Sequence, residues 1–221
     1  MNKINIAIDG YSGTGKSSTA KSVANALNYT YIDSGAMYRA TTLFFLRKKV
    51  DWSDLNQIKL TLEELKLNFL GSEIILNSED VSDEIRSMKV NEAVSHVAAI
   101  KIVRLEMVRQ QQQMGAKKGV VMDGRDIGTV VFPLAELKIF MIANAEVRAL
   151  RRQSELSENG VVEELYVVKS NLLERDRIDS SRLESPLVKA DDAIEMDTSN
   201  LSFDEQVRKI VEMAKTKINE S

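Results

Sequence analysis

The chain has 221 residues, of which 43% are apolar and 29% are charged, with a formal net charge of −3. This composition is typical of a globular domain and lacks the overall basic character that binding to nucleic acid or to an acidic membrane surface favours. There is no cysteine and only one histidine, which excludes disulfides, thiolate zinc sites and histidine-based metal sites. The apolar run at the N-terminus is too short for a signal peptide, and no run approaches the roughly 18 residues of a membrane span, so we expect a cytoplasmic protein.

Strand-like and helix-like segments alternate along the chain. Short apolar runs predict buried strands at Ile4–Ile8, Thr30–Ile32, Val120–Met122, Leu137–Ile142 and Ala193–Met196. Helices are predicted at Lys16–Leu27, Met37–Lys49, Val90–Met114, Glu146–Leu156 and Phe203–Asn219. The alternation predicts an α/β fold with a parallel five-stranded sheet, and the S-x-x-E capping box that begins at Ser202 marks the start of the last helix.

Two segments interrupt this alternation. Residues 50–89 predict a small inserted subdomain, with a helix that starts near Thr61 and a hairpin that pairs Leu67–Leu70 with Ile74–Leu76 across Gly71-Ser72. Residues 151–186 are helical, charged and rich in arginine, which is typical of a mobile surface element.

The stretch GYSGTGKSST at residues 10–19 fits the pattern G-x-x-x-x-G-K-[ST] and lies between a predicted strand and a predicted helix. Its glycines allow consecutive backbone N–H groups to face one point, toward which the helix also directs its positive N-terminus. Lys16 can contact the β and γ phosphates of a nucleotide, and the Ser17 hydroxyl suits Mg²⁺. The alternative is a glycine turn that only joins a strand to a helix. Asp9, directly before the loop, is interpreted as a turn residue.

Two further segments are expected at the carboxyl ends of strands, where ligands of open α/β sheets bind. In the first, Ser34 is predicted to cap the helix that starts near Ala36, and Arg39 lies in the first turns of that helix. In the second, VVMDGRD, the strand ends at Asp123 as in a carboxylate linked to Mg²⁺, and Arg125 and Asp126 follow. A solvated arginine and a surface salt-bridge turn are the alternatives.

The run ERDRIDSSR at residues 174–182 places Arg175 and Asp179 four apart on a helix, with Arg182 three further along. It is either an exposed helix face with salt bridges, each worth only tenths of a kcal/mol, or a basic lid over phosphates. Phosphoryl transfer depends on alignment, Mg²⁺ and several cations. The chain offers five for this purpose: Lys16, Arg39, Arg125, Arg175 and Arg182.

With these segments in view, the sequence resembles the bacterial cytidylate kinases, which are P-loop nucleoside monophosphate kinases. The resemblance covers nearly the whole chain and is most specific in five stretches: IDGYSGTGKSS, YIDSGAMYR, EDVSDEIRS, VMDGRDIGTVVFPLAELKIFM and ERDRIDSSRLESPL. It implies a P-loop NTPase core at about 1–49, 90–147 and 187–221, an NMP-binding insert at about 50–89, and a lid at about 148–186.

The resemblance also implies transfer of a phosphoryl group from ATP to CMP or dCMP with Mg²⁺, by a monomer. The residues implied to bind ATP are Gly10, Ser12, Gly13, Thr14, Gly15, Lys16, Ser17, Ser18, Arg151 and Arg152. Those implied to bind the acceptor are Ser34, Arg39, Ser95, Arg104, Arg125, Asp126, Arg175, Asp179 and Arg182. Lys16, Arg125, Arg175 and Arg182 are the expected catalytic residues, with Ser17 and Asp123 at the metal. Asp126 suits the reading of cytosine, because a carboxylate accepts from the N4 amino group.

Three other functions remain open from the sequence. A kinase of the same fold could phosphorylate another nucleotide, or a small molecule such as shikimate. A switch protein would bind a nucleotide and a partner, although the guanine-reading pattern N-K-x-D is absent from the chain. A sensor would bind nucleotide without turnover, which the intact Lys16, Ser17 and Asp123 argue against.

Overall fold

The computed structural model describes residues 2–71, 73–158 and 160–220. The chain divides into two compact units. The first contains the residues up to Tyr31 together with those from Lys117 onward, and the second contains Ile32–Ala116. No helix in these three described ranges has both the length and the apolarity to cross a membrane.

A parallel sheet confirms the predicted α/β fold. Its strand order is β2, β6, β1, β7, β8, and Ile6 of the central strand lies opposite Val121 on one side and Leu137 on the other. The strands are β1 (Asn5–Gly10), β2 (Thr30–Asp33), β6 (Val120–Gly124), β7 (Leu137–Ile142) and β8 (Ile194–Asp197). The strands β1, β6 and β7 are buried along nearly their whole length, as is typical of parallel strands.

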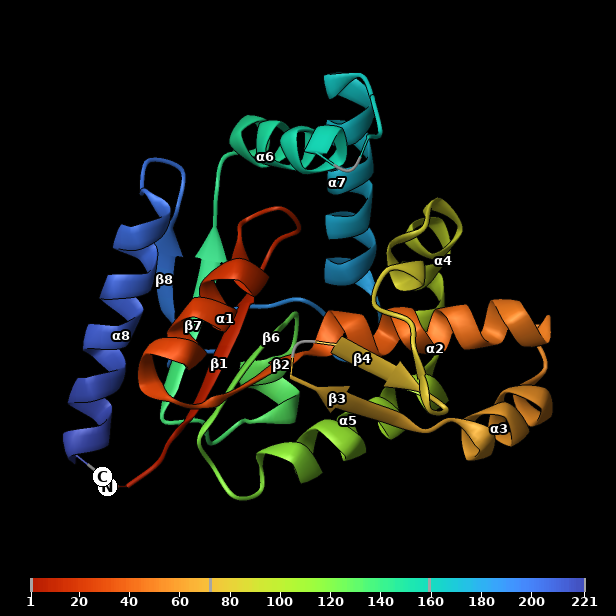
Figure 1. Ribbon diagram of the computed structural model, residues 1–221, viewed down its shortest axis with the longest axis horizontal. Coiled ribbons are helices and arrows are strands. Elements are labelled where there is room, and N and C mark those ends of the chain that lie inside the picture. The colour runs from red at the N-terminus through yellow and green to blue at the C-terminus, as the bar shows by residue number, and fades with distance from the viewer. Residues whose placement is uncertain (1, 72, 159, 221) are drawn as a thin grey trace. The chain divides into compact units, whose positions relative to one another are not determined.

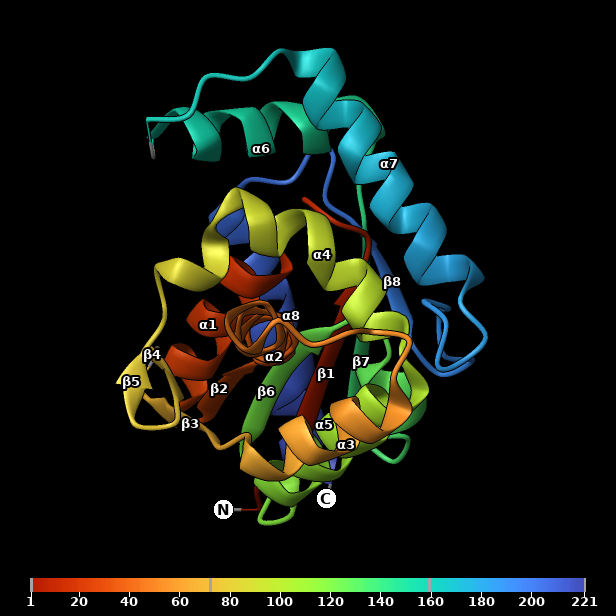
Figure 2. The same cartoon turned by 90° about the vertical axis from the view of Figure 1, so that its right-hand side faces the viewer.

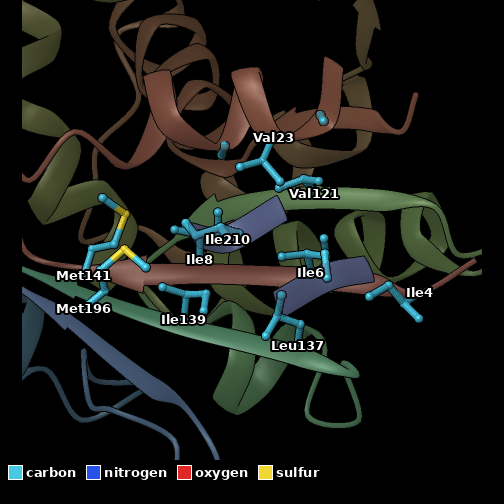
Figure 3. Close-up of a cluster of buried hydrophobic side chains, with 13 residues drawn as sticks. Ile4, Ile6, Ile8, Val23, Val121, Leu137, Ile139, Met141, Met196 and Ile210 are labelled. Atoms are coloured by element: carbon cyan, nitrogen blue, oxygen red, sulfur yellow. The ribbon is translucent and has the colours of Figure 1, made fainter. Parts of the chain in front are cut away.

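The core of the first unit lies between this sheet and the helices α1 (Lys16–Leu27) and α8 (Phe203–Glu220). Figure 3 shows the β1 side chains Ile6 and Ile8 packed with Val23 of α1 and Ile210 of α8, all of them buried. The predicted capping box is present at the start of α8. The Glu205 carboxylate accepts from the Ser202 N–H at 2.9 Å, and the Ser202 hydroxyl oxygen accepts from the Glu205 N–H at 3.3 Å.

Two further helices of this unit, α6 (Ala145–Glu158) and α7 (Leu165–Ser181), lie against each other, as both views show (Figures 1 and 2). They share a small apolar cluster of Ala149, Val168 and Leu172. They occupy the predicted arginine-rich segment. Because the apolar cluster is small, the orientation of α7 depends on the polar contacts described below.

In its described residues, 32–71 and 73–116, the second unit combines four α-helices with a small antiparallel sheet in the order β3, β4, β5 (Figure 2). Its elements are α2 (Ser34–Lys48), α3 (Leu55–Glu64), β3 (Leu67–Leu70), β4 (Glu73–Leu76), β5 (Glu79–Asp80), a 3₁₀ turn at Glu84–Arg86, α4 (Met88–Ala99) and α5 (Lys101–Gly115). The predicted hairpin is confirmed, because Leu67 pairs with Leu76. Of its predicted turn, Ser72 lies outside the described residues.

Three helix predictions were wrong in this unit. The helix predicted to start near Thr61 runs over Leu55–Glu64, because Asp54 caps it by accepting from the N–H groups of Asn56 and Gln57. The cap of α2 is likewise Asp33, which accepts from Ala36 N–H at 2.8 Å, and Ser34 is the first helical residue.

The third error is the single helix predicted over Val90–Met114. It is two helices, α4 and α5, separated at Ile100, whose backbone is extended. Arg104 of α5 stabilises this break, since its Nη1 donates to the Ala98 carbonyl near the end of α4 at 3.1 Å. The periodicity of the sequence continues across the break and does not reveal it.

Candidate active site

The loop after β1 has the backbone that the sequence pattern predicts for phosphate binding. Gly10 has φ +144°, and a Cβ there would lie 2.0 Å from the Met141 carbonyl oxygen, so only glycine fits. Gly15 has φ +87° and forms the N-cap of α1 without a side chain. The loop therefore meets the positive end of α1 directly, an arrangement that favours an anion.

Lys16 is buried at the start of α1. Its Nζ donates to the Tyr11 carbonyl at 2.6 Å and to Thr14 Oγ1 at 3.4 Å, which holds the ammonium group across its own loop. Burial, followed by repulsion from Arg125, lowers the pKa of Lys16 well below its usual range. The phosphates of a bound nucleotide would supply the negative charge that this buried cation favours.

Ser17 and Asp123, the two residues expected at the metal, lie together. The Ser17 hydroxyl donates to Asp123 Oδ2 at 2.8 Å, and the Tyr31 hydroxyl donates to Asp123 Oδ1 at 2.8 Å. One hydroxyl and one carboxylate oxygen thus face each other beside the phosphate loop. These are hard oxygen ligands of the kind that Mg²⁺ prefers, so the residues present fit the ion.

Asp9 is not the turn residue that the sequence suggested. It lies within β1, is buried, and accepts from the backbone N–H groups of Ile127 and Gly128 at 2.9 and 2.7 Å. These contacts hold the π-helical turn at Ile127–Val131, directly after Asp126. Burial raises the pKa of Asp9 to about 6, although both backbone bonds oppose the shift.

The structure brings Arg125, Asp126, Asp179 and Arg182 together within the first unit. Arg125 Nε donates to Asp179 Oδ2 at 3.0 Å, and Arg182 Nη1 donates to Asp179 Oδ1 at 3.3 Å. Arg182 Nη2 also lies 3.7 Å from Asp126 Oδ1. Two arginines and two carboxylates therefore alternate, which allows all four charges to remain in a largely buried position.

Arg175 lies on the same side of α7 as Asp179, four residues before it. Its Nε is buried and has no hydrogen-bond partner in the described part of the chain. Burial, and then repulsion from Arg125, lowers the pKa of Arg175 to about 10. An anion placed between Arg125 and Arg175 would relieve both effects.

The sequence reasoning missed Asp176 and assigned Arg148 no function beyond the start of the lid. Asp176 accepts from the Ser12 N–H at 3.0 Å and from Arg148 Nη1, and Arg148 Nη1 also donates to the Ser12 carbonyl at 3.0 Å. The signal for Asp176 was its position, three residues before Asp179 and thus on the same helix face.

The two arginines expected at ATP differ in placement. Arg151 Nη1 lies 3.4 Å from the Thr14 carbonyl of the phosphate loop, and its Nη2 donates to the Thr198 carbonyl at 2.7 Å. Arg152 instead pairs with Glu155 on its own helix. The remaining residues expected at ATP, Gly13 and Ser18, belong to the loop and to the first turn of α1.

Four acceptor residues expected from the sequence lie in the second unit. Arg39 Nη1 donates to Asn91 Oδ1 at 2.6 Å and to the Ile85 carbonyl at 3.2 Å. Ser34 is buried at the start of α2, and Ser95 is buried on α4. Arg104, also buried, lies over the Tyr38 ring with Cζ 5.2 Å from its centroid.

Comparison with known proteins agrees with this arrangement. The family model described as cytidylate kinase matches residues 6–216. The chain belongs to the cytidylate kinase family. A cytidylate kinase of Flavobacterium psychrophilum is 54% identical over 96% of this chain and 98% of its own, and one of Fusobacterium nucleatum is 49% identical over 94% and 95%.

Among solved structures, an uncharacterised protein from Eubacterium ventriosum matches the full length of both chains with a TM-score of 0.50 at 12% identity, which indicates a shared fold only. As a member of the cytidylate kinase family, the protein is a nucleoside monophosphate kinase that transfers a phosphoryl group to CMP or dCMP. The family assignment gives the reaction, and the geometry above suggests which side chains perform it.

Proposed function

We propose that this cytidylate kinase uses ATP with Mg²⁺ as its donor, and that the loop from Gly10 to Ser18 binds the donor phosphates. The observation that carries the proposal is the contact of Ser17 Oγ with Asp123 Oδ2 at 2.8 Å beside the buried Lys16. Mg²⁺ held near this pair would neutralise phosphate charge and orient the phosphates. Lys16 would stabilise the charge that develops on the transferred group.

Within the first unit, we assign binding of the acceptor to five residues: Arg125, Asp126, Arg175, Asp179 and Arg182. Arg125 and Arg175 repel each other and are both partly desolvated, so an acceptor phosphate fits the space that they face. Asp126 would accept from the cytosine amino group, and Asp179 from a ribose hydroxyl. The corresponding roles of Ser34, Arg39, Ser95 and Arg104 in the second unit rest on the family resemblance. We also propose a cytoplasmic monomer.

The test is steady-state ADP formation with CMP, dCMP, UMP, AMP and GMP in separate reactions, each at several Mg²⁺ concentrations and with ATP or GTP as donor. We expect turnover with CMP and dCMP only, and a strict requirement for Mg²⁺. Ser17→Ala should shift the Mg²⁺ dependence to higher concentration by about tenfold, because one of the two oxygen ligands is lost. Full activity in the presence of a chelator would overturn the metal assignment.

A further inference from the structure

Ser12 is buried in the phosphate loop, and each of its three polar groups contacts a charged side chain. Its N–H donates to Asp176 Oδ1 at 3.0 Å, and its carbonyl accepts from Arg148 Nη1 at 3.0 Å. Its hydroxyl oxygen accepts from Arg125 Nη2 at 2.7 Å. These partners come from α7, from α6 and from the segment after β6, so one loop residue joins three separate elements.

The backbone of Ser12 is fixed by a buried ion pair. Arg148 and Asp176 bond to each other, and their side chains are only 6% and 9% exposed. Arg148 also donates through Nε to the Ala143 carbonyl at 3.1 Å and lies over the Tyr11 ring, with Cζ 5.5 Å from its centroid. Buried charges with this many partners are held rigidly, because any displacement leaves a charge unpaired in a poorly solvated place.

The guanidinium group of Arg125 is held by hydrogen bonds from each of its three nitrogens. Besides the Ser12 hydroxyl, it contacts Asp179 Oδ2 through Nε at 3.0 Å and the Gly124 carbonyl through Nη1 at 3.2 Å. The contacts to Ser12 and Asp179 lie at two different nitrogens and so define the plane of the guanidinium group. Loss of the Ser12 contact would leave the guanidinium held by Asp179 and Gly124 but no longer tied to the phosphate loop.

We propose that Ser12 is a positioning residue for phosphoryl transfer, whose hydroxyl sets the guanidinium of Arg125 relative to the phosphate loop while the buried Arg148–Asp176 pair holds Ser12 in place. This inference rests on the proposed function, in which the loop binds the donor and Arg125 binds the acceptor phosphate. Ser12 then carries the alignment between the two substrates, which is the main requirement of this reaction.

Ser12→Ala tests the proposal, because it removes the hydroxyl and leaves both backbone contacts in place. We expect kcat/KM for CMP to fall roughly 10- to 100-fold, the range for losing a hydrogen bond to a charged group. The affinity for a non-hydrolysable ATP analogue with Mg²⁺, measured by calorimetry, should stay within about twofold. The backbone groups through which the loop is proposed to bind ATP are unchanged in this variant. If the Ser12 hydroxyl itself contacted ATP, that affinity would fall, and a purely structural role would change only the melting temperature; either result overturns the proposal.

Asp176→Asn gives an independent measurement, with Glu174→Gln as its matched control. Glu174 lies on the same helix and pairs with Arg177, but both are exposed. The two substitutions Ser12→Ala and Asp176→Asn are also combined in one protein. If Asp176 acts through Ser12, the fold loss in kcat/KM for CMP in this double variant will be smaller than the product of the two single losses. Fully multiplicative losses in folded proteins would contradict the proposal, and Ser12→Ala decides alone if Asp176→Asn fails to fold.

The same data separate this inference from the function on which it rests. Absence of CMP turnover in the unmodified protein would contradict the proposed function. Normal turnover in the unmodified protein together with unchanged kcat/KM in Ser12→Ala would contradict only the role of Ser12.

Discussion

The two faces of α7 are built from the same kinds of residue and differ in what those residues contact. On one face, Asp176 and Asp179 are buried and bond to Ser12, Arg148 and Arg125. On the other, Arg177 and Glu174 form an exposed pair three residues apart. The second face is the solvated salt-bridge face that the charged run ERDRIDSSR could have formed throughout. The comparison teaches that burial and tertiary partners, rather than charge content, distinguish the two faces.

Substitution of Lys16 should give the largest loss of activity. Lys16 is the buried cation of the loop that is contacted by the inner face of α7, the face that carries Asp176 and Asp179. We predict that Lys16→Ala lowers kcat by about 10³-fold or more, because charge stabilisation in the transition state is lost. Lys21→Ala, an exposed position on α1, is the control and should retain activity. Near-normal kcat for a folded Lys16→Ala protein would remove the loop from the catalytic account.

Asp126, which lies near Arg182 at the end of α7, tests the proposed recognition of the base. We predict that Asp126→Asn lowers the ratio of kcat/KM for CMP over UMP by about tenfold or more, because an amide can donate to uracil O4 where the carboxylate could only accept. Asp191→Asn, at an exposed position, is the matched control. An unchanged ratio would place base recognition elsewhere.

Asp9 should give a smaller effect that depends on pH. Its pKa in the folded protein is raised from 3.8 to about 6, so the folded state binds the proton more readily than the unfolded state does. Protonation of Asp9 therefore stabilises the fold as the pH falls through about 6 toward 4, with Asp126 favouring and Lys16 opposing it.

The direction of this change in stability with pH can be measured against Asp9→Asn, which lacks the titrating carboxyl group. Between pH 7 and pH 5, the free energy of unfolding of the unmodified protein should rise by about 1 kcal/mol relative to the variant. Chemical denaturation of both proteins at both values of pH provides the measurement. A difference between them that does not change with pH would contradict the raised pKa.

The sequence predicted the parts of the molecule that depend on local pattern. The five strands, the phosphate loop and the capping box at Ser202 follow from apolar periodicity and residue chemistry over a few positions. The helix break at Ile100 could not be predicted, because it depends on Arg104 meeting the Ala98 carbonyl. The cap of α2 was misplaced by one residue, since Asp33 and Ser34 are both good capping residues.

The candidate site shows the same limit. Lys16, Ser17 and Asp123 stand out from the sequence because each fits a known chemical requirement at its position. Asp176 and Asp9 do not, because their importance comes from backbone N–H groups more than 100 residues away, at Ser12 and Ile127. The helical spacing of Asp176 from Asp179 indicates a shared helix face, but no local pattern indicates these distant partners.

Arg175 and Arg177 allow the most direct test of the difference between the two faces of α7, because they are the same residue type two positions apart. Each is replaced by glutamine, and kcat is measured with ATP, Mg²⁺ and saturating CMP. We predict at least about a 100-fold loss for Arg175→Gln, because we have proposed that the acceptor phosphate binds beside Arg175, and a change within about twofold for Arg177→Gln. Equal effects of the two substitutions, or an unchanged kcat for Arg175→Gln, would contradict the assignment of the inner face of α7 to catalysis.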